Sequence, residues 1–135
     1  DLHHRTRMTT RRRDGRTART DWRVLARLEG YTLVEVNLHT GRTHQIRVHF
    51  SALGHAVVGD TLYGAPQTPH AGRLSLEPLG RNFLHAARIV FTHPVKQEAV
   101  EVRAPLPAQL REWLASLTAA SGSGAREVDA VLRKY

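Results

Sequence analysis

The stretch TGRTHQIRVH, Thr40–His49, is central to the fold because it places two arginines, two histidines and a glutamine within ten residues. As a strand, it would set Ile46, Val48 and Phe50 on one face. As a helix, Ile46, Phe50 and Leu53 recur at positions i, i+4 and i+7. Both patterns fit the apolar residues, so the flanking residues have to decide between them.

The flanking residues favour a helix over Thr43–Leu53. Thr43 is a candidate N-cap, and Gly54 stands where a left-handed residue commonly ends a helix. One face of this helix would be polar, opposite the apolar stripe, and it would carry His44, Arg47 and Ser51. The basic turn before it then leads into a helix N-terminus, which is a favourable place for an anion.

Upstream of this helix the sequence predicts three consecutive antiparallel strands. The segments Arg7–Arg12 and Thr17–Leu28 flank Asp14-Gly15, a dipeptide suited to the positive φ angles of a tight hairpin turn. After a break at Gly30, the alternating residues 31–38 predict a third strand.

Downstream, the pattern alternates between loops, strands and helices. Residues 54–64 are punctuated by glycines, and residues 82–94 predict a core strand that ends at Pro94. A further strand is expected over residues 98–107, and a helix over residues 107–117 with Leu110, Trp113, Leu114 and Leu117 inward. We therefore expect an α+β fold with a mixed, mainly antiparallel sheet over residues 1–118. A linker and a short C-terminal helix would follow over residues 119–135.

Positive charge is concentrated at the start of the chain. The net charge is +8, and residues 1–27 contribute +6 of it through nine arginines and three aspartates. Arginine suits phosphate because its planar fork donates two parallel hydrogen bonds. A nucleic acid is the first candidate partner, and a merely solvated basic hairpin is the alternative.

The composition excludes several functional classes. The chain has no cysteine, which rules out disulfides, thiolate metal sites and thiol nucleophiles. It also lacks an apolar run that approaches the roughly 20 residues of a membrane span. We expect a soluble cytoplasmic protein.

Metal and hydrolase sites are not supported by the motifs. His39, His44, His49 and His55 are spaced by five, five and six residues. A spacing of five alternates faces in a strand and separates side chains by about 140° in a helix, so the histidines do not converge. No serine occurs in a Gly-x-Ser-x-Gly elbow. We predict no metal site.

Three ordered motifs resemble the RluA-type pseudouridine synthases, which isomerise uridine to pseudouridine in ribosomal or transfer RNA. They are LHTGRTHQIRVHFSALGHAVVGDTLYG (residues 38–64), LHAARIVFTHP (residues 84–94) and EVRAPLP (residues 101–107). The preceding RMTTRRRDGRTARTDWRVL (residues 7–25) is also similar to that family. The resemblance covers Met8–Leu117 and corresponds to the C-terminal half of the family's catalytic domain.

The resemblance implies that Arg47 is the arginine that partners the family's catalytic aspartate. That aspartate lies in an upstream Arg-Leu-Asp motif, followed by a strand that carries a tyrosine, and neither motif occurs here. Asp60 and the other aspartates of this chain stand in sequence contexts that differ from that motif. The expectation is therefore a piece of a longer enzyme that lacks the nucleophile and is inactive by itself.

The same resemblance suggests residues that contact RNA, with ribosomal RNA favoured over transfer RNA. Leu84 matches a buried apolar residue near the target base, although a core role would also explain it. Contacts to phosphate or to loops of the RNA are expected from the following residues: Arg11, Arg12, Arg13, Arg42, His44 and Gln45.

Two alternatives remain open at this stage. In the first alternative, the chain is a non-catalytic remnant of this fold that binds RNA but does not modify it. A weaker option is an enzyme for a phosphate ligand that uses the TGRTHQ turn. The sequence predicts neither the target uridine nor the oligomeric state.

Overall fold

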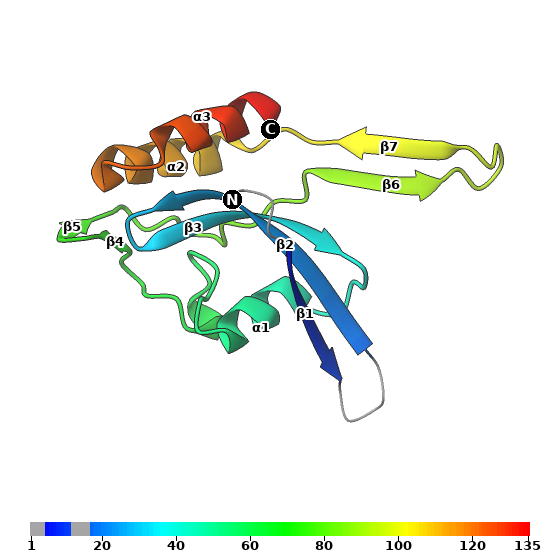
Figure 1. Ribbon diagram of the computed structural model, residues 1–135, viewed down its shortest axis with the longest axis horizontal. Helices are drawn as coiled ribbons and strands as arrows, with labels where there is room; N and C mark the ends of the chain where they lie inside the picture. The colour runs from blue at the N-terminus through cyan, green and yellow to red at the C-terminus, as the bar shows by residue number, and fades with distance from the viewer. Residues whose placement is uncertain (1–4, 12–16) are drawn as a thin grey trace.

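The computed structural model describes residues 5–11 and 17–135, and it contains a three-stranded antiparallel sheet with helices on both faces (Figure 1). Strand β1 (Arg5–Arg11) pairs with β2 (Thr17–Leu28), and β2 pairs with β3 (Tyr31–Leu38). The predicted order of three antiparallel strands is confirmed. The turn predicted between the first two strands lies outside the described residues.

A bulge in β2 explains how side chains of one strand pack against helices on both faces of the sheet. The register with β3 shifts between Val24 and Ala26, so one extra residue is inserted and the alternation of side chains is inverted. Before the bulge, Trp22 packs edge-on against Phe50 of the helix on one face. After it, Ala26 and Leu28 belong to the core formed with the helices on the other face.

Helix α1 (Gln45–Ala52) confirms the helical interpretation of the central stretch. It begins two residues later than predicted. His44, in the left-handed conformation at φ 51°, is its N-cap, and no side chain caps it. Thr43 is therefore not the cap. Gly54 adopts the predicted positive φ just after the helix.

The main core lies between the sheet and two C-terminal helices, α2 (Ala108–Ser121) and α3 (Ala125–Lys134). All four residues predicted to face inward on α2 are buried, and Leu110 is fully enclosed. Helix α2 continues four residues beyond Leu117 into the predicted linker, because two alanines extend it and Gly122 ends it in the left-handed conformation. Val128 of α3 belongs to the same core.

The end of α3 is attached to the sheet by a cluster of charges. The hydroxyl of Tyr135 donates a hydrogen bond to Glu35 on β3, and Lys134 and Arg23 also donate to that carboxylate. Burial and the neighbouring Glu35 raise the pKa of Tyr135 to about 12. The last residues are thus an integral part of the fold.

Two hairpins and one 3-10 turn complete the part of the chain that the structure describes. Strands β4 (His70–Ala71) and β5 (Leu74–Ser75) pair with each other, and the turn η1 (Thr61–Tyr63) lies within the glycine-punctuated segment, between Gly59 and Gly64. Strands β6 (Arg88–Thr92) and β7 (Ala99–Arg103) form a ribbon that extends away from the rest of the molecule (Figure 1).

The prediction of a core strand within residues 82–94 is wrong for the structure described. The strand covers only β6, and every residue of β6 is exposed, including Ile89 at 60% and Phe91 at 45%. The apolar pattern was detected correctly, but the described chain provides no layer to cover it.

The α+β class is confirmed, with helices and antiparallel strands in similar amounts. None of the helices that the structure describes combines the length and apolar character needed to span a bilayer.

Candidate functional site

Arg47, in the middle of α1, forms a two-pronged ion pair with Asp60. Its Nε lies 2.8 Å from Oδ2, and its Nη2 lies 2.8 Å from Oδ1. Asp60 is 1% exposed, and 17% of the Arg47 side chain is exposed. Hydrogen bonds from Arg47 lower the pKa of the Asp60 carboxyl despite burial, so the carboxylate is charged at neutral pH.

The ring of Tyr63 fixes the guanidinium from a second direction. The Cζ atom of Arg47 lies 4.9 Å from the centroid of this ring. The Tyr63 hydroxyl is 3.1 Å from Nδ1 of His44, and Ser51 donates a hydrogen bond to the Tyr63 carbonyl. The polar face predicted for α1 therefore binds η1, and together they hold Arg47 in one orientation.

The position of Asp60 depends on the preceding glycine. Gly59 has φ +83°, and a Cβ there would lie 1.9 Å from the carbonyl oxygen of Arg81. The backbone N–H of Phe83 donates to the Val58 carbonyl at 2.8 Å, which joins the two loops. Only glycine combines this conformation with so close an approach.

A buried polar network attaches α1 to β2. Gln45 donates from Nε2 to Oγ1 of Thr20 and to the carbonyl of Arg19, both at 2.9 Å. Its Oε1 accepts from the Thr40 hydroxyl at 2.7 Å and from the backbone N–H of Arg42 at 3.1 Å. Gln45 is 5% exposed. These hydrogen bonds give Gln45 a structural role, and its contact with RNA stays a prediction.

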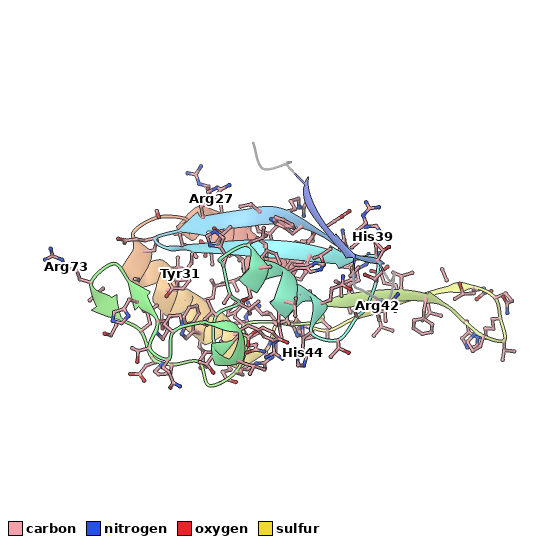
Figure 2. The ribbon with its side chains drawn as sticks, turned by 90° about the horizontal axis from the view of Figure 1, so that it is seen from below. Arg27, Tyr31, His39, Arg42, His44 and Arg73 are labelled. Atoms are coloured by element: carbon pink, nitrogen blue, oxygen red, sulfur yellow. The ribbon has the colours of Figure 1, made fainter. Side chains whose placement is uncertain are left out.

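The remaining predicted RNA residues are spread over the structure. Figure 2 shows Arg42 beside the connection from β3 to α1, at the same end as His39. The Nε of Arg42 is buried and has no hydrogen-bond partner within the described part of the chain. His44 is exposed and reaches Arg47 only through Tyr63. Arg11 ends β1, whereas Arg12 and Arg13 lie outside the described residues.

Leu84 lies in an irregular segment before β6 and not in a strand as expected. It is half-buried, and its carbonyl accepts a hydrogen bond from Arg81 at 3.2 Å. Within residues 5–11 and 17–135, no hydrogen bond, ion pair or ring contact joins Leu84 to Arg47. In the same ranges, no three His, Cys, Asp or Glu side chains gather as metal ligands would.

Sequence reasoning missed the two residues that hold Arg47. Asp60 and Tyr63 stand in VVGDTLYG, where an acid follows a glycine and a tyrosine comes three residues later. A charged residue among apolar and glycine neighbours was a signal of a buried partner, because an unpaired carboxylate is rarely enclosed.

The chain is similar in sequence to proteins that are named as RNA pseudouridine synthases. Residues 1–52 match the sequence model of a family described as RNA pseudouridylate synthase. An uncharacterized RNA pseudouridine synthase of Chloroflexus aurantiacus is 48% identical over 104 residues, which are 77% of this chain and 31% of that protein.

Two further relatives carry the name ribosomal large subunit pseudouridine synthase D. The one from Haemophilus ducreyi is 39% identical over 108 residues, which cover 76% of this chain and 33% of that protein. The one from Neisseria meningitidis is 38% identical over 125 residues, which cover 90% and 33%. The chain spans about a third of the length of these relatives.

Proposed function

We propose that this chain, a member of the RluA-type pseudouridine synthase family, is part of an enzyme that isomerises uridine to pseudouridine in RNA. Arg47 supplies the partner of a catalytic aspartate that lies outside the chain. The observation that carries the proposal is the fixed guanidinium of Arg47, which Asp60 and Tyr63 orient within the motif shared with that family.

The role of Arg47 follows from electrostatics. A carboxylate that attacks a nucleotide in a partly dry pocket tends to take up a proton, because burial disfavours its charged form. A guanidinium beside it opposes this shift and orients its two oxygens by charge-assisted hydrogen bonds. In the proposed reaction the glycosidic bond to uracil N1 is broken, the base turns, and a bond from uracil carbon 5 to the ribose forms. Carbon 5 then loses its hydrogen as a proton and N1 takes up a proton, so that the product is an isomer of the substrate. This chemistry uses neither metal nor organic cofactor.

RNA binding is assigned to basic residues of two segments, the start of α1 and the arginine-rich beginning of the sequence. Arg42, with its buried unpartnered Nε, and His44 stand at the start of α1, and the arginines near the β1–β2 connection add positive charge. Contacts to phosphate would offset the few kcal/mol that extruding a uridine from its stack costs. Leu84 remains a candidate for contact with the base. Ribosomal RNA, and hence the cytoplasm, is our preferred setting, since two relatives are named for the large ribosomal subunit.

The test uses the full-length polypeptide that contains this chain. We expect Arg47→Ala and Arg47→Lys to abolish tritium release from RNA labelled at uracil carbon 5, because lysine cannot reproduce the planar fork. Arg126→Ala is the control, since this arginine is exposed on α3. Near-normal release by Arg47→Ala would refute the assigned role. RNA binding without any turnover by the wild-type protein would favour the alternative of a non-catalytic RNA-binding remnant.

A further inference from the structure

The guanidinium group of Arg47 has two edges that can each bind a carboxylate. The side-on edge comprises Nε and Nη2, and the end-on edge comprises Nη1 and Nη2. Asp60 occupies the side-on edge with two contacts of 2.8 Å. The Nη1 atom has no hydrogen-bond acceptor among the described residues, and the side chain is 17% exposed. The end-on edge is therefore the one left for a second anion.

We propose that Asp60 is a positioning residue, which holds the side-on edge of Arg47 so that the end-on edge is presented to a second carboxylate. This inference rests on the proposed function, in which that carboxylate is the catalytic aspartate. Asp60 is not expected to contact the substrate, because it is 1% exposed and both of its carboxylate oxygens bind Arg47.

The surroundings of the pair favour this arrangement over an incidental ion pair. Arg47 is a long side chain with several rotatable bonds, and fixing it in one orientation costs conformational entropy. Asp60 sits on a backbone that Gly59 and the Arg81 carbonyl hold in close contact. The Tyr63 ring restricts the remaining rotation of the guanidinium. The ordering is thus complete before a second anion arrives, which is how a preorganised site lowers the cost of reaching its transition state.

The experiment compares Asp60→Asn with Glu101→Gln in the full-length polypeptide. Both substitutions neutralise a carboxylate paired with arginine, but Glu101 lies on β7, where it binds Arg88 and Arg103. We expect Asp60→Asn to lower kcat by about ten- to hundredfold, since misplacing a catalytic group by about 1 Å costs this much. The Kd for RNA should stay within about twofold, and Glu101→Gln should leave kcat unchanged.

A second measurement separates positioning from folding and from the proposed function. NMR of arginine Nε–H groups, with the Arg47 signal assigned by its loss in Arg47→Lys, should show slow exchange in the wild type and fast exchange in Asp60→Asn. The Tm of Asp60→Asn should fall, because Arg47 loses its buried partner, so both spectra are recorded well below the Tm of the variant. Wild-type kcat in folded Asp60→Asn would overturn the inference, as would slow exchange of the Arg47 signal in that variant. If the wild type forms no pseudouridine, the proposed function fails together with the assignment of the second anion, while the NMR signal still reports on the Arg47–Asp60 pair.

Discussion

The hydroxyl of Thr20 on β2 lies 2.7 Å from Nδ1 of His49 on α1, and both side chains are buried. Thr20 also accepts from Gln45, so its own proton is available to His49. Burial lowers the pKa of His49, which agrees with a neutral imidazole that can accept this proton. Polar contacts thereby fix the rotation of α1 against the sheet, and this rotation directs Arg47 toward Asp60.

Replacing Thr20 by valine keeps the shape of the side chain but removes both hydrogen bonds. Gln45 and His49 would then each lose a buried hydrogen bond to Thr20, and each loss costs about 1 to 3 kcal/mol. We expect Thr20→Val to lower the free energy of unfolding by at least about 2 kcal/mol, measured by urea denaturation. Thr32→Val is the control, because Thr32 is exposed on the neighbouring strand β3. Equal effects of the two substitutions would contradict the structural role of the network.

Two glycines of the same loop separate backbone strain from steric overlap. Gly64 has φ +104° and open space at its Cβ position. Gly64→Ala should therefore lower the free energy of unfolding by only about 1 to 2 kcal/mol, the cost of placing a non-glycine residue in the left-handed conformation. Gly59→Ala adds an overlap with the Arg81 carbonyl and must shift backbone next to Asp60. We expect thermal unfolding to show a clearly larger fall in Tm for Gly59→Ala than for Gly64→Ala. A smaller loss for Gly59→Ala than for Gly64→Ala would show that the two loops separate easily.

Local patterns were sufficient to predict much of this architecture. Alternation predicted β2 and β3 with their observed ends, and the inward residues of α2 were identified from helical spacing. The choice of a helix for the central stretch was correct because Gly54 and the i, i+4 pattern act locally. The bulge beside Val24 was not predicted, since it depends on which helices cover each face of the sheet.

The contacts within the candidate site could not be predicted from local sequence patterns. Arg47 was singled out by its motif, but its partner Asp60 lies thirteen residues away across a loop whose path depends on contact with Arg81. Gln45 was predicted as a contact to RNA, whereas its amide is buried and makes four hydrogen bonds within the described residues. A sequence gives the polarity of a side chain directly, whereas its burial follows from elements that are distant in the chain.

The carboxyl of Asp21 on β2 makes a pH-dependent contribution to stability. A hydrogen bond from Arg19 is the main cause that lowers its pKa from 3.8 to about 2, and His39 adds to it. A carboxyl with a depressed folded-state pKa stabilises the fold above its unfolded-state pKa, and this contribution is lost as pH falls through the folded-state pKa. The relevant window is therefore from about pH 4 to about pH 2.

Asp21→Asn removes this contribution, so the variant should be less stable than the wild type at neutral pH. The difference between the two should shrink as the pH is lowered from about 4 to about 2, as measured by urea denaturation at successive pH values. Asp129→Asn, at an exposed position of α3, should show no such convergence. A difference for Asp21→Asn that stays constant down to the lowest pH would mean that the ion pair with Arg19 does not stabilise the fold.

The β6–β7 ribbon has one apolar face and one polar face. Cross-strand pairing places Ile89 opposite Val102, and Phe91 opposite Val100, so these four side chains share one face. The other face carries Val90 together with Arg88, Glu101 and Arg103. A two-stranded ribbon is marginally stable in water, and an exposed apolar face promotes association.

We therefore expect the chain of 135 residues to self-associate through this apolar face with a measurable dissociation constant in sedimentation equilibrium. Val102→Thr and Val90→Thr form a matched pair, because the two valines are 49% and 48% exposed and lie on opposite faces. Val102→Thr should weaken association by about 1 to 2 kcal/mol, or about five- to thirtyfold, since a hydroxyl is buried without a partner. Val90→Thr should leave the dissociation constant unchanged. Equal weakening by both variants, or a strictly monomeric wild type, would show that the apolar face of the ribbon does not drive association.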